Sequence, residues 1–189
     1  MTGSEEDLRV ARTNRALKEA FEELVLEKDV DKITITELTK RAGVNRKTFY
    51  LHYETIEALY DELISALMDE FFSLYETTPD VPEDLGGHAK RFFTFLATHD
   101  EVTERLVYKP GSYDFGSRLY YDQMMKYKSV GNPFEWLGPE KESLVLAFIR
   151  STALDFYRRW IKDGKKVPIE EAAELLATMT CYGANALMK

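Results

Sequence analysis

The chain has 189 residues, of which 44% are hydrophobic and 31% charged, a composition typical of a folded globular protein and not of a disordered one. Its 25 basic and 33 acidic residues give a formal net charge of -8, which argues against a general polyanion binder, so any nucleic-acid site must be a local basic patch. A single cysteine, Cys181, excludes an internal disulfide and a thiolate metal cluster.

Neither a membrane span nor a secretion signal is expected. No run reaches the ~18 consecutive apolar residues that a transmembrane helix requires. The acidic start, Glu5-Glu6-Asp7, is not the pattern of a signal peptide. Together with the lone cysteine, these features predict a protein of the reducing cytoplasm.

Charge and aromatic residues divide the chain into two parts. Residues 1–56 hold ten basic and eleven acidic residues, whereas residues 57–189 hold fifteen and twenty-two, together with twenty of the twenty-four aromatic residues. The segment from Leu38 to Tyr53 contains four cations and no carboxylate. We therefore predict a small, locally basic head, residues 1–56, and a larger acidic body, residues 57–189.

The predicted elements are helices. Apolar residues recur at i, i+3, i+4 and i+7 between Leu17 and Val25, which predicts a first helix over residues 9–28. The same spacing from Ile56 to Tyr75 predicts a long fourth helix, which ends before Pro79. Further helices are predicted at about 89–96, 119–127, 140–162 and from Pro168 onward. Sustained strand alternation is absent from the sequence, so the predicted fold class is all-α.

Two short helices lie between the first and fourth. Thr34 and Glu37 fit a capping box that begins a helix ending near Ala42-Gly43, where glycine permits a left-handed backbone. Asn45 is a suitable N-cap for the next helix, which continues to about Leu51. Two helices of this size around a tight turn are typical of a helix-turn-helix, in which the second helix enters the DNA major groove.

The second short helix has the chemistry that such a role requires. Asn45, Arg46, Lys47 and Thr48 lead it, while Val44 and Phe49 are spaced to face the core. Arg46 and Lys47 are suited to read guanine edges or to neutralise phosphate, and Asn45 either contacts a base or only caps the helix. Tyr50 and His52 supply donors at the helix end, where phosphates flank the groove.

The segment from Ile33 to Tyr53 resembles the TetR-type (TetR/AcrR) transcriptional regulators. The resemblance rests on a threonine-led helix, an Ala-Gly-Val turn and the Thr-Phe-Tyr-Leu-His-Tyr recognition segment, and it extends over roughly residues 9–63. It implies a three-helix head joined by the long fourth helix to a helical effector-binding and dimerisation body. It also implies DNA contacts at Arg12, Thr13, Thr34, Thr36, Asn45, Arg46, Lys47, Thr48, Tyr50 and His52.

One position departs from the family pattern. Many members have a lysine at the start of the fourth helix that contacts a phosphate, whereas this chain has Ile56 there, with Glu54 two residues earlier. A phosphate contact from this helix start is therefore in doubt.

A head of this size reads only a few base pairs, so the resemblance implies a homodimer on a near-palindromic operator, with half-sites about 34–36 Å apart. The last two predicted helices are the expected interface. Small residues recur on the final helix, and large ones on either helix supply buried bulk; the predicted interface residues are Phe156, Trp160, Ala173, Leu176, Ala177, Cys181 and Ala184.

The aromatic body either packs a plain core or lines an effector pocket. Candidate pocket residues from different predicted helices are Phe71, Tyr75, Phe92, Tyr120, Met124 and Phe148. His88 and His99 lack the spacing of a metal site, and Cys181 fits helix packing, so neither a metal nor a cofactor is expected.

The function that these features favour is a sequence-specific DNA-binding transcriptional regulator, a repressor released or modulated by an effector in the body. An alternative is a co-activator of the same family controlled by a protein partner. A remote alternative is a helical small-molecule carrier or enzyme without DNA binding. Because the sequence has no catalytic triad, paired-carboxylate or glycine-rich phosphate motif, we do not expect an enzyme.

Overall fold

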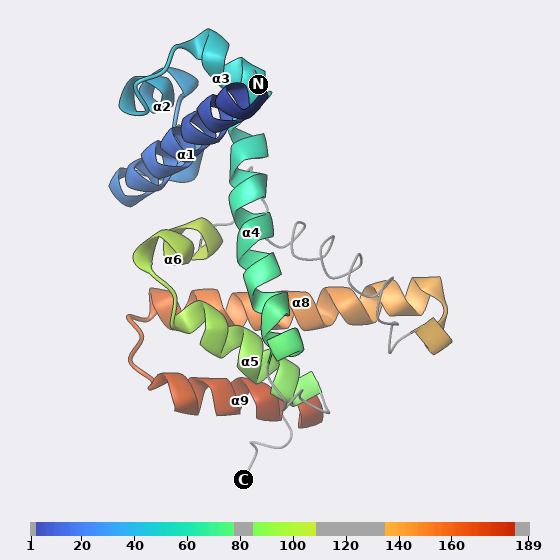
Figure 1. The fold of residues 1–189 in the computed structure, drawn as a ribbon. Coiled ribbons are helices and arrows are strands. Elements are labelled where there is room, and N and C mark those ends of the chain that lie inside the picture. The colour runs from blue at the N-terminus through green and yellow to red at the C-terminus, as the bar shows by residue number, and fades with distance from the viewer. Residues whose placement is uncertain (1–2, 78–84, 109–134, 184–189) are drawn as a thin grey trace. The chain divides into compact units, whose positions relative to one another are not determined.

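The protein folds as a set of α-helices, which confirms the all-α prediction (Figure 1). The structure is a computed structural model that describes residues 3–77, 85–108 and 135–183, and within these ranges no residue forms a β-strand. The chain divides into two compact units between Ile64 and Ser65. Both residues lie within α4 (Ile56–Thr77), so one long helix belongs to both units; the predicted division after residue 56 lies eight residues earlier, at the first residue of this helix.

The N-terminal unit, which we call the head, contains the three helices that the sequence predicts before the long fourth one. These are α1 (Gly3–Glu27), α2 (Ile35–Arg41) and α3 (Arg46–His52), with a single 3-10 turn, η1 (Val30–Lys32), after α1. Helix α1 begins earlier than the predicted residue 9. Its first turns carry acidic residues, which favour a helix N-terminus, but no apolar periodicity that would mark them.

The head core joins its three helices to the first turns of α4. Leu17 and Phe21 of α1, Leu38 of α2, Phe49 of α3 and Leu59 of α4 are all completely buried. Burying each such side chain contributes about 1.5–3 kcal/mol to stability relative to leaving it exposed. This core fixes α3 against its neighbours through one side only, so the opposite side of α3 is free to face a partner.

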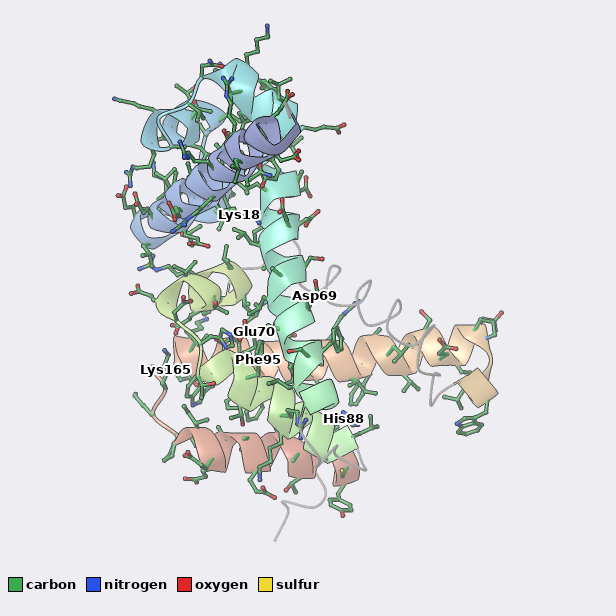
Figure 2. All side chains as sticks on the ribbon, in the orientation of Figure 1. Lys18, Asp69, Glu70, His88, Phe95 and Lys165 are labelled. Carbon is green, nitrogen blue, oxygen red and sulfur yellow. The ribbon has the colours of Figure 1, made fainter. Side chains whose placement is uncertain are left out.

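Polar contacts reinforce the junction of α1 with α4. The Lys18 ammonium, labelled in Figure 2, lies 2.7 Å from an Oε1 atom of Glu62. Burial, followed by the nearby Glu62 carboxylate, raises the pKa of Tyr53 above its ordinary range. Burial is the largest single influence on the pKa of Glu62 and raises it, but the Lys18 ammonium and the nearby Tyr53 hydroxyl outweigh burial, so the pKa is lowered.

The second unit, which we call the body, is built from helices on either side of α5. Helix α5 lies between α8 and α9 in Figure 1. After α4, the described elements of the body are α5 (Leu85–Ala97), α6 (Glu101–Tyr108), the 3-10 turn η2 (Glu135–Leu137), α8 (Pro139–Lys162) and α9 (Ile169–Tyr182). The predicted helices at 89–96, at 140–162 and after Pro168 are thus confirmed, whereas the one at 119–127 lies outside the described residues. No helix in the described ranges has the length and hydrophobicity needed to cross a membrane.

An aromatic cluster forms the body core. The ring of Phe93 lies 6.0 Å from that of Tyr157 and 5.3 Å from that of Trp160, both edge-on. The Tyr157 hydroxyl donates to the Leu96 carbonyl at 3.2 Å, and Trp160 Nε1 donates to the Val167 carbonyl at 2.8 Å. Burial raises the pKa of Tyr157, and the two donors satisfy the polar ends of large apolar side chains.

Candidate nucleic-acid interface

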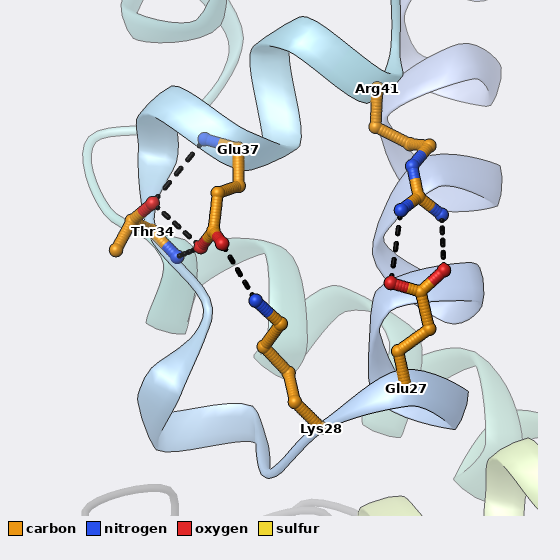
Figure 3. A network of polar contacts seen from close by, with 5 residues as sticks. All are labelled: Glu27, Lys28, Thr34, Glu37 and Arg41. Atoms are coloured by element: carbon orange, nitrogen blue, oxygen red, sulfur yellow. Dashed lines mark hydrogen bonds and ion pairs between the residues drawn. The ribbon is translucent and has the colours of Figure 1, made fainter.

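Helix α2 begins with the predicted capping box. The Thr34 hydroxyl accepts a hydrogen bond from the Glu37 amide at 3.3 Å, and the Thr34 amide donates to the Glu37 carboxylate at 3.2 Å (Figure 3). The same carboxylate accepts from the Thr34 hydroxyl at 2.8 Å and from the Lys28 ammonium at 2.6 Å. The Lys28 and Thr34 hydrogen bonds lower the pKa of Glu37 to about 2. Because the Thr34 hydroxyl is already engaged here, a DNA phosphate would have to compete with the cap.

Arg41 fastens the other end of α2 to α1. Its Nη1 and Nη2 atoms donate to the two carboxylate oxygens of Glu27 at 2.9 and 3.0 Å, and Nη1 also lies 3.1 Å from Glu23 (Figure 3 shows the Glu27 contact). Hydrogen bonding to Glu27 and then to Glu23 raises the pKa of Arg41, and the pKa of Glu27 is lowered in return. Arg41 thus belongs to the architecture of the head, although the sequence places it in the same basic segment as Arg46.

The turn between α2 and α3 depends on Gly43. Its backbone has φ +67°, the left-handed region that glycine adopts without steric cost, as the sequence predicted. The Val44 amide then donates to the Thr39 carbonyl at 3.0 Å, and the buried Thr39 hydroxyl donates to the Ile35 carbonyl at 2.8 Å. The Val44 bond ties the turn back to α2, whereas the Thr39 bond lies within α2 and satisfies a buried hydroxyl.

Helix α3 begins with Asn45 as its N-cap. The Asn45 Oδ1 atom accepts from the Thr48 amide at 2.8 Å and from the Thr48 hydroxyl at 3.1 Å. Of the two roles that the sequence left open for Asn45, the structure shows the cap. The half-buried Thr48 hydroxyl is engaged in the same contact.

The two faces of α3 differ sharply. On the inner face Phe49 is completely buried, and its ring lies 5.9 Å from that of Tyr53. On the outer face Arg46 and Lys47 are exposed, and Tyr50 is 50% exposed. Within the described parts of the chain, no carboxylate pairs with Arg46 or Lys47. The outer face is therefore a cationic surface held rigidly by its apolar back.

The other predicted head contacts vary in accessibility. Thr36 and Arg12 are exposed, whereas Thr13 and His52 are half-buried. The Thr13 hydroxyl donates to the Arg9 carbonyl one turn earlier, at 3.0 Å. Thr36 and Arg12 are thus the more accessible of these four to a DNA backbone.

The start of α4 explains why position 56 is an isoleucine and not the phosphate-binding lysine described above. Ile56 is only 8% exposed and contributes to the head core. Thr55 caps the helix, since its hydroxyl accepts from the Ala58 amide at 3.1 Å. Glu54 is exposed beside it. A lysine at position 56 would have to leave the core to reach a phosphate, and this chain uses the position for packing instead.

The predicted pocket residues do not form one group in the described structure. Phe71 and Phe92 are buried with ring centroids 5.3 Å apart, whereas Phe148 is 65% exposed on α8. Tyr75 lies in α4, and Tyr120 and Met124 lie outside the described residues. A further ring, Phe95, lies 5.2 Å from Phe71, so the buried pair belongs to a packed aromatic core.

The predicted interface residues also separate. Trp160, Ala173 and Leu176 are buried within the body, Phe156 and Ala177 are half-buried, and Cys181 is exposed; Ala184 lies outside the described residues. The predicted interface set omits the large apolar side chains that are exposed on the same two helices, one of which, Phe148, was predicted to line a pocket instead. These are Leu144 (73% exposed) and Phe148 on α8, and Leu175 (36%) and Tyr182 (75%) on α9. The sequence did carry a signal for them, because Leu144 and Phe148 are four residues apart and Leu175 and Tyr182 are seven apart, spacings that place each pair on one side of its helix.

Comparison with known proteins connects the head to a family. Residues 17–63 match the family described as bacterial regulatory proteins, tetR family. A 59-residue stretch is 42% identical to the uncharacterized HTH-type transcriptional regulator YxbF of Bacillus subtilis (strain 168). That match covers 31% of this chain and only 16% of YxbF, so the chain spans a small part of this curated relative's length.

Several solved structures share the fold over nearly the whole chain. A TetR transcriptional regulator from Streptococcus agalactiae 2603V has a TM-score of 0.67 at 24% identity, over 95% of this chain and 99% of its own. NalD of Pseudomonas aeruginosa, the secondary repressor of the MexAB-OprM multidrug efflux pump, has a TM-score of 0.64 at 19% identity, over 94% and 97%. FadR of Bacillus subtilis, solved with stearoyl-CoA, has a TM-score of 0.54 at 14% identity, over 89% and 98%. At these identities the likeness concerns the fold.

Proposed function

We propose that this chain is a member of the tetR family of bacterial regulatory proteins, and that it is a sequence-specific transcriptional repressor that binds a near-palindromic DNA operator as a homodimer. The observation that carries the proposal is the two-sided α3, with Phe49 buried behind it and Arg46 and Lys47 exposed on its outer face. A helix with this arrangement enters the major groove with its leading residues toward the base edges.

The contacts in the head support different roles for its polar and cationic side chains. Arg46 and Lys47 would read bases or bind the nearest phosphates, since they lead the helix and have no carboxylate partner among the described residues. Thr36, Tyr50 and Arg12 would bind phosphates around the groove. Arg41 would hold α2 in place without touching DNA, because Glu27 already binds both of its terminal nitrogens.

Dimerisation follows from the size of the head, because one short recognition helix reads too few base pairs for a specific operator. We assign the interface to the outer faces of α8 and α9, where Leu144, Phe148, Leu175 and Tyr182 are exposed in the protomer. A stable interface of ordinary size would bury ~1,600 Å² and cover these side chains. Ala177 and Cys181 would contribute at its edge.

Control by an effector would act through α4, which belongs to both units. An effector that prefers a body conformation in which the two heads are misplaced lowers operator affinity by its differential binding free energy, typically ~1–3 kcal/mol. The structural likeness to NalD, which is a repressor, and to FadR, which was solved with stearoyl-CoA, supports repression as the sign of regulation and a small molecule as the effector.

The experiment that tests this function is in-vitro selection of duplexes from a random library with the full-length chain. We expect enrichment of one half-site, repeated with approximate two-fold symmetry and centres one helical turn apart or a multiple of it. Failure to enrich any sequence, with duplex retained regardless of its composition, would contradict the proposal.

A further inference from the structure

The outer face of α3 contains an exposed apolar residue that charge and hydrogen bonding do not explain. Leu51 is 77% exposed, and among the described residues of the head it is the most exposed large hydrophobic side chain. An isolated surface leucine is ordinary, but this one lies four residues after Lys47, on the same side of a helix proposed to enter the groove.

Helical geometry directs Leu51 straight away from the core. Each residue turns the helix by about 100°, so Leu51 points about 160° away from Phe49, which is completely buried. Lys47 and Leu51 therefore form the outermost ridge of α3. With Phe49 buried behind the helix, this ridge would face the floor of the groove if α3 enters it.

Position along the helix separates Leu51 from the leading cations. Five residues of helical rise place its backbone about 7.5 Å beyond that of Arg46 along the axis of α3, about twice the ~3.4 Å spacing of base pairs, so the two side chains would meet different base pairs. An aliphatic side chain offers no hydrogen bond to a base edge there. The one apolar group that a base presents in the major groove is the 5-methyl group of thymine.

We propose that Leu51 is a specificity-determining residue that contacts a thymine methyl group in each half-site of the operator. This inference rests on the proposed function, because it requires α3 in the major groove. The contact favours thymine over cytosine at one position, since cytosine lacks the methyl group and presents an amino group that a leucine leaves unpaired.

The test uses deoxyuridine, which pairs as thymidine does but lacks the methyl group. In the selected duplex, each thymidine is replaced in turn, symmetrically in both half-sites, and affinity is measured at one fixed salt concentration. At one position we expect wild-type affinity to fall about four-fold per half-site, and about fifteen-fold for both, from the free energy of burying one methyl group.

The Leu51→Ala variant decides whether Leu51 is the cause. This variant is expected to bind the thymidine duplex more weakly than wild type does. It is also expected to bind the thymidine duplex and the deoxyuridine-substituted duplex with nearly equal affinity. Lys47→Ala is expected to weaken binding but to keep the full deoxyuridine effect. Leu26→Ala, which shortens another exposed leucine at the far end of α1 (40% exposed), is expected to change neither affinity nor the effect.

The possible outcomes distinguish failure of the Leu51 proposal from failure of the proposed repressor function. Selective binding in which Leu51→Ala retains the deoxyuridine effect, or a selected half-site without thymine, would overturn the role of Leu51 and leave the repressor proposal intact. Equal affinity of the wild-type chain for selected and arbitrary duplexes would overturn the proposed function itself.

Discussion

Arg41 of α2 is held by both carboxylate oxygens of Glu27, the last residue of α1, so its charge is neutralised within the head. Arg46, five residues later, has no such partner among the residues that the structure describes. The two arginines of this basic segment therefore differ: Arg41 joins α2 to α1, whereas the charge of Arg46 is exposed on α3.

This difference predicts that two alanine substitutions both weaken DNA binding but that only one of them lowers Tm. Arg41→Ala removes contacts between α1 and α2, so we expect a lower Tm and weaker DNA binding as a consequence. Arg46→Ala is expected to leave Tm unchanged and to weaken binding of the selected duplex by about 1–3 kcal/mol if the residue reads a base. Thermal denaturation followed by circular dichroism, and fluorescence anisotropy with labelled duplex, measure the two properties. Equal losses of Tm in both variants would contradict the assignment.

Glu37 provides a prediction about pH. Its pKa in the folded head is about 2, below the ordinary value of 4.5, because Lys28 and Thr34 bind its charged form. A lowered carboxylate pKa contributes stability above pH 4.5 that is lost as pH falls from about 4.5 toward about 2.

Glu37→Gln keeps the shape of the capping residue but removes its charge, so it isolates this contribution. We expect the variant to melt at a lower temperature than wild type at pH 7, with a difference that shrinks steadily below pH 4.5. High salt is expected to reduce the difference too, since both Lys28 and Glu37 are partly exposed. A Tm difference that stays constant between pH 7 and pH 3 would count against the ion pair.

Glu54 is an exposed acidic residue next to the proposed DNA surface, two residues before Ile56 at the start of α4. We expect Glu54→Gln to strengthen binding to all duplexes alike, because it removes repulsion from phosphates. Glu54→Lys is expected to add about one unit to the slope of log affinity against log salt. Measuring affinity for selected and arbitrary duplexes over a salt series tests both; an unchanged slope for Glu54→Lys would place the residue away from DNA.

The dimer interface gives a further prediction. Phe148→Glu places a charge on the outer face of α8 without disturbing the protomer core, so we expect folded monomers in sedimentation velocity and loss of specific binding. Ala177→Glu is expected to act similarly from α9. In contrast, Leu176→Ala opens the buried core of the body and is expected to destabilise the protomer by about 2–5 kcal/mol. If Phe148→Glu remains dimeric, the interface lies elsewhere; Leu26→Glu serves as the surface control.

The two short helices of the head were predictable to within a residue or two because their boundaries depend on local chemistry, whereas the start of α1 was missed by six residues. Thr34 and Asn45 cap the two short helices, because each side chain accepts a hydrogen bond from the amide three residues later. Gly43 adopts the left-handed backbone conformation that the turn requires. Local signals also marked Pro168 before α9. Even α6, which we did not predict, carries such a signal: the Asp100 carboxylate accepts from the Thr103 amide at 2.8 Å.

The partners of side chains were not predictable, because they depend on how helices pack. Arg41 binds Glu27, which lies fourteen residues earlier in the chain. Nothing in the sequence marks this pairing or distinguishes Arg41 from Arg46 and Lys47, which follow it in the same basic segment. In α9, small residues occur on both the buried and the exposed faces, so Ala173 was predicted at the interface although it packs inside the body. Phe148 was predicted in a pocket because it is aromatic, and only the structure shows that it is exposed.

The most direct test of the central claim is the ratio of two affinities measured on the full-length chain in one buffer. One duplex carries the selected half-sites, and the other has the same base composition in scrambled order. The account predicts that the selected duplex binds at least about a thousand-fold more tightly at physiological salt. A ratio near one would mean that the outer face of α3 does not read DNA sequence, and would contradict the account.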